Sequence, residues 1–195
     1  MKSLPISREK AWELVKKYNS DPSDLKHYLE SEAVMRELAI YLHEDEDYWV
    51  ILGLVHDIDW DVTKKEVSTH LTKMPSILKE AGFPDDFIEK ILSHGYGFEE
   101  LPHLKDKKRS EKIHHALAAS ETITGLIHAY ALMRGGRVSD MEASGLKKKF
   151  KDKTFAAKVS RDVIKEIEAL GITLNEFFKI AIEGIKKIKE QVGLI

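Results

Sequence analysis

Apolar side chains recur every three to four residues along most of the chain, which is the spacing of one face of an α-helix. The few candidate strands are too short and too charged to form a sheet, so the pattern predicts an all-α fold. The expected helices begin at capping residues or prolines and end near Gly, Pro or polar loops. They cover a first segment after Ser7 and then the approximate ranges 22–43, 44–59, 65–80, 84–94, 110–133, 154–170 and 174–192.

Two segments outside these helices are long and irregular. They are HGYGFEELPHLKDKK, residues 94–108, and RGGRVSDMEASG, residues 134–145. Because long loops over a helical scaffold often carry binding groups, we expect functional side chains in or beside them.

The composition limits what the protein binds and where it works. Its 195 residues can bury an apolar core without disulfides, and the 0 cysteines fit a reducing cytoplasm. No run of about 18 apolar residues and no signal peptide is present, so we expect a cytoplasmic protein that does not enter a membrane. A formal charge of −2 lacks the basic excess of a nucleic-acid binder, so any attraction for phosphate must be local. The abundance of Lys and Glu leans towards a thermophile.

The stretch LGLVHDIDWD, residues 52–61, places a histidine and an aspartate at the end of an apolar helix. Successive side chains on a helix point about 100° apart, so His56 and Asp57 can approach one ion from two directions. Gly53, one turn earlier, allows another helix to come close. A carboxylate beside a neutral imidazole is a common metal-binding pair, whereas the alternative is an Asp at a helix end that pairs with a Lys.

The order of further ligand-type residues gives this pair a context. His27 lies on a buried-looking helix face, His70 near the start of one predicted helix, His94 at the end of the next, and Glu121 within a long helix. This order resembles the HD superfamily of metal-dependent phosphohydrolases. LGLVHDID resembles the superfamily's GLLHDIG helix, and HHALAASETITGLIHAYALMRGG resembles the helix that carries its last ligand. LKKKFKDKTFAAKVSRDVI resembles the C-terminal part of an uncharacterised bacterial and archaeal HD hydrolase group.

The resemblance implies a single HD-type domain, a helical bundle with its core at about 22–135 and a helical extension at about 140–195. It also implies a metal site of one or two divalent ions, among which Fe, Mn, Zn, Mg, Ni and Co are not distinguished. One ion is expected on His27, His56, Asp57 and Glu121, and the other on Asp57, His70 and His94. Asp57 is the bridging and catalytic carboxylate of this set.

Two departures from the family pattern matter. Glu121 stands where the family has Asp, and its side chain is one methylene longer. A subgroup that acts on cyclic dinucleotides has HDIGK and a proline after Gly-Tyr, whereas this chain has Trp60 and no proline after Tyr96. A mononuclear site without His70 and His94 is the weaker alternative.

Other charged groups are candidates for supporting roles. His114 and His128 lie seven residues from Glu121 and are equally open to ligand support, substrate contact or no role, while His43, His103 and His115 are expected at the surface. Asp59 and Asp61 fit a loop that turns on Asp, or they orient a ligand imidazole. In the lysine-rich stretch 146–154 and the helix after it, the candidate substrate-binding cations are Lys148, Lys149, Lys153 and Arg161. The alternative for the lysines is a solvated face.

Together these features predict a metal-dependent phosphohydrolase that cleaves a phosphomonoester or phosphodiester of a nucleotide-like small molecule with metal-activated water. Two alternatives share the same residues. One is an HD-fold di-iron oxygenase, and the other is a non-catalytic nucleotide-binding protein. The sequence leaves the oligomeric state open.

Overall fold

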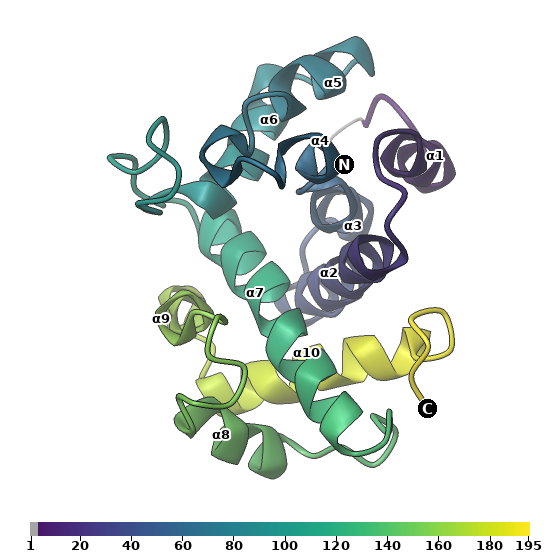
Figure 1. Cartoon of the computed structure of the whole chain (residues 1–195), viewed down its shortest axis with the longest axis vertical. Helices are drawn as coiled ribbons and strands as arrows, with labels where there is room; N and C mark the ends of the chain where they lie inside the picture. The colour runs from purple at the N-terminus through teal and green to yellow at the C-terminus, as the bar shows by residue number, and fades with distance from the viewer. Residues whose placement is uncertain (1–3) are drawn as a thin grey trace.

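The computed structural model describes residues 4–195, and within this range the regular elements are all helical, which confirms the predicted all-α fold. Figure 1 shows α7 descending from the upper helices and crossing α10 in the lower half. None of the described helices is long and apolar enough to cross a membrane. In chain order the elements are α1 Arg8–Tyr18, α2 Pro22–Leu42, α3 Glu46–Val55, α4 Trp60–Thr63, η1 Val67–Thr69, α5 Met74–Glu80, α6 Asp85–Leu92, η2 Ser93–Gly95, α7 Lys112–Met133, α8 Ala143–Lys151, α9 Arg161–Lys165, η3 Glu166–Leu170 and α10 Leu174–Ile188.

Helix α2 is the centre of the bundle, and it packs most extensively against α3, α10 and α7. It begins at Asp21, whose side chain accepts a hydrogen bond from the Ser23 amide, and Pro22 occupies its first turn. It ends at His43, which adopts the left-handed conformation with φ 57°. Its middle is buried on several sides, and the side chains of Val34, Met35 and Leu38 join the apolar core.

Helix α3 is almost wholly apolar and buried from Tyr48 to Val55. Asp45 caps its first turn by accepting a hydrogen bond from the Tyr48 amide. The predicted end near Asp59 was wrong, because α3 ends at Val55 and a turn follows. The Trp60 amide donates to the carbonyl oxygen of Asp57, so His56 and Asp57 lie on a turn between α3 and α4.

The predicted helix over 65–80 was also wrong at its first half. The chain forms the short 3-10 turn η1 there, and α5 begins only at Met74. Between them Leu71 has φ 66°, which an α-helix does not allow. The carboxylate of Asp59 accepts hydrogen bonds from the amides of Leu71, Lys73 and Met74, and these bonds hold the chain in a bend.

The C-terminal third differs most from the prediction. Helix α8 contains most of the lysine-rich stretch and the end of the predicted loop 134–145. Its Leu146 and Phe150 lie one turn apart and are both buried, so this stretch forms an amphipathic helix. The predicted helix over 154–170 was wrong at its first half, since residues 152–160 form a loop and α9 begins only at Arg161. η3 continues the chain from α9.

Two glycines let neighbouring helices approach α2 closely. A Cβ atom on Gly53 of α3 would lie 2.8 Å from the carbonyl oxygen of Ser31, and one on Gly184 of α10 would lie 2.7 Å from that of Ala33. Both positions are helical, where Ala is otherwise favoured over Gly by about 1 kcal/mol. The backbone contact therefore explains the choice of glycine.

We expect Gly53→Ala and Gly184→Ala each to lower the free energy of unfolding by roughly 1–3 kcal/mol, because the added methyl group forces the helices apart. Urea unfolding followed by circular dichroism measures the change. An unchanged or higher midpoint in both variants would contradict the close packing on α2.

Candidate metal centre

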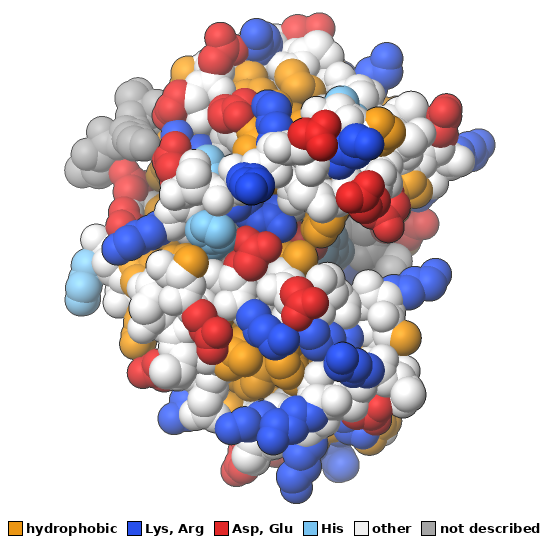
Figure 2. Space-filling view, turned by 90° about the vertical axis from the view of Figure 1, so that its left-hand side faces the viewer, with side chains coloured by type: hydrophobic (Ala, Val, Ile, Leu, Met, Phe, Trp, Pro, Cys, Tyr) orange, Lys and Arg blue, Asp and Glu red, His pale blue; other side chains and the backbone are white. Residues whose placement is uncertain are grey.

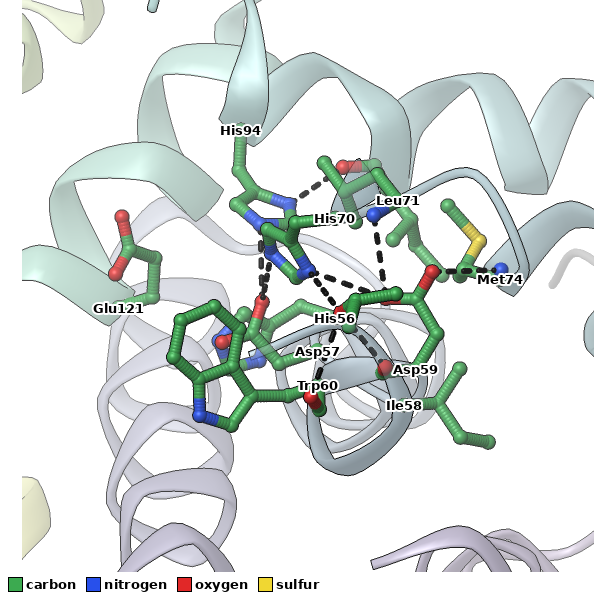
Figure 3. A network of polar contacts seen from close by, with 12 residues as sticks. His56, Asp57, Ile58, Asp59, Trp60, His70, Leu71, Met74, His94 and Glu121 are labelled. Atoms are coloured by element: carbon green, nitrogen blue, oxygen red, sulfur yellow. Dashed lines mark hydrogen bonds and ion pairs between the residues drawn. The ribbon is translucent and has the colours of Figure 1, made fainter. Parts of the chain in front are cut away.

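Four histidines and one aspartate converge near the turn after α3, and their ligand atoms form two groups that share Asp57. The first group holds His27, His56 and Asp57, and the second holds Asp57, His70 and His94. Within each group the ligand atoms all lie within 4.8 Å of one another. Figure 3 shows His70 and His94 on one side of the Asp57 carboxylate, with Trp60 beside His70.

The first group joins α2 to the turn after α3. The Nε2 atoms of His27 and His56 lie 3.2 Å apart. The Oδ2 atom of Asp57 is 3.5 Å from Nε2 of His56 and 4.0 Å from Nε2 of His27. His56 is fully buried, whereas the side chain of His27 is 31% exposed, so this group is reached from the His27 side.

The second group uses the other carboxylate oxygen. The Oδ1 atom of Asp57 lies 3.2 Å from Nε2 of His70 and 3.1 Å from Nε2 of His94. His70 follows η1 and His94 lies in η2, so the two come from separate short turns. One carboxylate thus presents one oxygen to each histidine pair.

Each of the four imidazoles uses its Nδ1 atom outside the cluster. Nδ1 of His56 lies 2.8 Å from the carbonyl oxygen of Gly53, and Nδ1 of His94 lies 2.7 Å from that of Ile91. Nδ1 of His70 lies 3.1 Å from Oδ1 of Asp59. Because these acceptors require a proton on Nδ1, a neutral imidazole keeps its lone pair on Nε2, which faces the cluster.

The Nδ1 atom of His27 also faces a hydrogen-bond acceptor, which here is a hydroxyl group. Its Nδ1 lies 3.0 Å from Oγ1 of Thr124 on α7. That hydroxyl donates its own proton to the carbonyl oxygen of Glu121 at 2.6 Å, so towards His27 it acts as an acceptor. Thr124 was not among the residues predicted from the sequence, although its hydroxyl lies one turn after Glu121 on the same helix.

The donor set fits divalent metal ions. With metal–ligand bonds of about 2.1 Å, neighbouring ligand atoms lie about 3.0–3.4 Å apart in octahedral and tetrahedral sites. The shortest separations in both groups, 3.1 Å and 3.2 Å, match such edges. Imidazole nitrogen with carboxylate oxygen suits Zn, Fe, Mn, Ni or Co. Asp57 belongs to both groups, and its role as a carboxylate that bridges two ions stays a prediction.

The charges within the cluster shift the pKa values of its members in opposite directions. Burial lowers the pKa of His56 to about 3, which keeps its imidazole neutral. Burial also opposes a charge on His70, but Asp57 and Asp59 raise the pKa of that imidazole to about 10. Burial favours a neutral Asp57, yet the surrounding imidazoles hold the pKa of its carboxyl well below the ordinary value. The carboxylate of Asp57 therefore stays charged and pairs with a protonated His70.

Asp59 satisfies both interpretations that the sequence left open. Its fully buried carboxylate orients His70 and also bonds the amides of the bend before α5. Asp61 does not contact the histidines. It accepts hydrogen bonds from the amide of Ser20 at 2.7 Å and from the ammonium group of Lys64 at 2.5 Å. Asp61 thus ties the turn to the start of α2.

Glu121 lies on α7 beside the cluster, but it belongs to neither group of converging ligand atoms in the described chain. Figure 3 shows its carboxylate to one side, on the neighbouring helix. One of its oxygens accepts a hydrogen bond from the hydroxyl of Thr122. Burial raises the pKa of this carboxyl, against the opposing effect of His94 and His27. Its role as a ligand of the first ion stays a prediction.

The remaining histidines lie outside the cluster. His128 contacts the buried Glu30 of α2 at 2.6 Å, and His114 accepts from backbone amides at the start of α7. His43, which caps the end of α2, and His103 are both exposed at the surface, as expected. His115 is partly buried and contacts Glu166 at 2.7 Å, so the expected surface position holds only in part.

Glu166 leads to an arginine that the sequence analysis missed. Arg109 forms a two-bond pair with Glu166, at 2.7 Å and 2.8 Å, and its side chain is 7% exposed. Its Nη1 also donates to the carbonyl oxygens of Ser93, His94 and Tyr96. The turn that carries His94 is thereby fixed to η3.

Two of the predicted substrate-binding cations, Lys148 and Lys149, lie on α8, away from the turns that carry His70 and His94. Figures 1 and 2 place α8, with many basic side chains, at the lower end of the molecule, whereas α4, α5 and α6 occupy the upper end. The ammonium group of Lys149 lies over the rings of Phe155 and Tyr130, and Lys148 and Lys153 are exposed. Their role in substrate binding stays a prediction.

Arg161 has another function. Its guanidinium group donates to backbone carbonyl oxygens of the preceding loop, among them those of Ala156 and Val159 at 2.7 Å each. Because these carbonyls already use its donors, the structure does not support Arg161 as a substrate cation. The cation that lines the pocket beside His27 and Glu121 is Lys158, which the sequence analysis missed.

We expect Thr124→Val to weaken metal binding by about 10–100-fold, because it removes the hydroxyl that holds His27 in its ligand tautomer. Thr124→Ser keeps the hydroxyl and is expected to restore most of the affinity. Competition with a chromogenic chelator measures both variants. Equal affinity for Thr124→Val and the wild type would show that the contact does not position His27.

Comparison with known proteins agrees with this arrangement. Residues 24–131, more than half of the chain, match the family model of the HD domain. Neither the curated proteins nor the solved structures give a match. The matched range contains all the residues of both ligand groups. The chain therefore belongs to the HD domain family, whose members are generally metal-dependent phosphohydrolases.

Proposed function

We propose that this protein is a metal-dependent phosphohydrolase that cleaves a phosphomonoester or phosphodiester of a nucleotide-like small molecule. The observation that carries the proposal is the position of Asp57, whose two oxygens face two separate pairs of imidazole Nε2 atoms. Two such sites joined by one carboxylate suit an in-line displacement at phosphorus. The same donors would also hold two irons, so oxygen chemistry is an outcome that the test below distinguishes.

Divalent ions in these sites would lower the pKa of a coordinated water and neutralise the charge of a phosphoryl group. The chain's own residues supply the framework for this chemistry. Asp57 sets the spacing of the two histidine pairs, and the outward Nδ1 bonds fix the direction of each imidazole. The exposed side of His27 and the adjoining pocket give a substrate access from one direction.

We expect the purified, metal-loaded protein to release phosphate or an alcohol from at least one compound in a panel of nitrophenyl phosphates and nucleotides. Asp57→Ala is expected to lower kcat by about a hundredfold or more, because several kcal/mol of charge stabilisation is lost. His103→Ala, at an exposed histidine, serves as the control. Iron-dependent oxygen uptake without hydrolysis, or full activity in Asp57→Ala, would overturn the proposal.

A second experiment counts the ions. Elemental analysis is expected to find two equivalents of metal in the wild type and about one in His94→Ala, because the first histidine pair remains intact. Asp57→Ala is expected to lose both, since both groups share that carboxylate. One equivalent in the wild type, unchanged in His94→Ala, would instead support a mononuclear site.

A further inference from the structure

A cavity of about 280 Å³ lies between α1, α2 and α10, and no residue of either ligand group lines it. Figure 1 shows the end of α10 on the same side of the molecule as α1. The volume of the cavity is close to the lower limit for pockets that bind small molecules, which is about 300 Å³. The cavity therefore has room for a small ligand and is separate from the candidate metal centre. We call it the arginine cavity, after Arg8 and Arg36 in its wall.

A buried carboxylate is shared by the two arginines of this cavity. The side chain of Glu32 is 7% exposed. Its Oε1 accepts hydrogen bonds from Nε of Arg8 and Nη2 of Arg36, each at 3.1 Å, and its Oε2 accepts from Nη2 of Arg8 at 2.7 Å. Arg8 begins α1, whereas Arg36 lies one turn after Glu32 on α2. One carboxylate thus orients guanidinium groups from two helices.

Both guanidinium groups keep donors that have no acceptor among residues 4–195. Arg8 bonds through Nε and Nη2, which leaves Nη1, and Arg36 bonds through Nη2, which leaves Nε and Nη1. Their side chains are 33% and 39% exposed. The side-chain amide of Gln191, in the wall of the same cavity, also has no hydrogen-bond partner in the described chain. An acceptor that enters the cavity can therefore reach unused donors from several directions.

The charges in the cavity wall favour an anion. The cations are Arg8, Arg36 and Lys187, and the anions are Glu32 and Glu37. The ammonium group of Lys187 donates to both oxygens of Glu37 at 2.7 Å each, so this pair is neutral. Two guanidinium groups and one carboxylate remain, which leaves one positive charge without a counterion in the wall. A bound anion would neutralise that charge.

Apolar groups complete the cavity. Leu29 and Ala33 line it from α2, and Ile188 lines it from the end of α10. Gly184 allows α10 to approach α2, because a Cβ atom there would lie 2.7 Å from the carbonyl oxygen of Ala33. Pockets for small molecules commonly combine such apolar walls with a few placed polar groups. The cavity can therefore contact a short carbon chain as well as an anionic head.

We propose that the arginine cavity is a second ligand site, which binds a small metabolite with one phosphoryl or carboxylate group on a short carbon chain. Arg8 and Arg36 donate to the anionic oxygens, for which the planar donor array of a guanidinium group is well suited. The apolar wall contacts the carbon chain. The proposal does not rest on the proposed function, because no residue of the candidate metal centre takes part.

Calorimetry with two non-hydrolysable probes tests the site. Ethylphosphonate represents the phosphoryl head and propionate the carboxylate head, and we expect at least one to bind with a Kd of about 1 mM or lower. The probe that binds more tightly identifies the head group. Arg36→Gln is expected to weaken binding by about tenfold, because a hydrogen bond between charged groups is lost. Arg137→Gln removes the same charge from an exposed arginine outside the cavity and is expected to match the wild type.

A further variant separates this site from the candidate metal centre, because bound metal ions would also attract a phosphonate. Asp57→Ala is expected to keep the affinity that Arg36→Gln loses. No heat of binding from either probe up to about 10 mM, or equal affinity in Arg36→Gln and Arg137→Gln, would overturn the proposal. Binding that is lost in Asp57→Ala but kept in Arg36→Gln would also overturn it, by assigning the probe to the metal centre.

Amide chemical shifts of the wild type locate the site without a substitution. Titration with the tighter probe is expected to shift the resonances of residues 29–37 and 184–191 most, because these ranges line the arginine cavity. Largest shifts at residues 53–60 and 91–96, which surround the candidate metal centre, would contradict the assignment.

Discussion

The negative charge of Asp57, shared between two pairs of imidazoles, is the interaction on which the rest of the site depends. The turn after α3 that carries Asp57 is held by side chains that precede α3 in the chain. Tyr28 donates its hydroxyl to the carbonyl oxygen of Asp57, and Asn19 donates to that of Ile58. Asn19 also accepts from Tyr28 and from the amide of Asp61. The turn is therefore fixed by α1 and α2 before any ion binds, and its carboxylate meets ligands that other elements bring to it.

The ligands depend in turn on contacts made between helices of the bundle. Thr124 of α7 orients His27 of α2, and one turn further along both helices His128 meets the buried Glu30. These two contacts align α2 with α7. They also explain why buried polar groups occur in a bundle that is otherwise apolar, since each has a partner on the facing helix. A displacement of α7 would disturb Thr124 and the ligand that it orients together.

The sequence allowed the helical fold, the central helices and the order of ligand-type residues to be predicted, because apolar periodicity and the His-Asp pair are local signals. What it could not show depended on contacts between distant residues. The break before Met74 follows from amides bound by Asp59, and the loop before α9 follows from carbonyls bound by Arg161. In both cases a single buried or partly buried charge overrides a helical pattern. Arg161 was predicted to bind the substrate because the sequence shows its charge but does not show the carbonyl oxygens to which it donates.

The ligand groups and the loop that faces them across the pocket are held in place by different kinds of contact. The HD match ends at residue 131 and includes both ligand groups, whereas Lys158 lies beyond it. The metal ligands need fixed positions on the bundle, because small displacements change the coordination geometry. The loop at 152–160 is held in another way, by the guanidinium group of Arg161, which donates to its backbone carbonyl oxygens. Because these bonds use backbone carbonyls, and the loop meets α7 where Gly125 has no side chain, the exposed side chains of the loop do not bear on the position of Asp57.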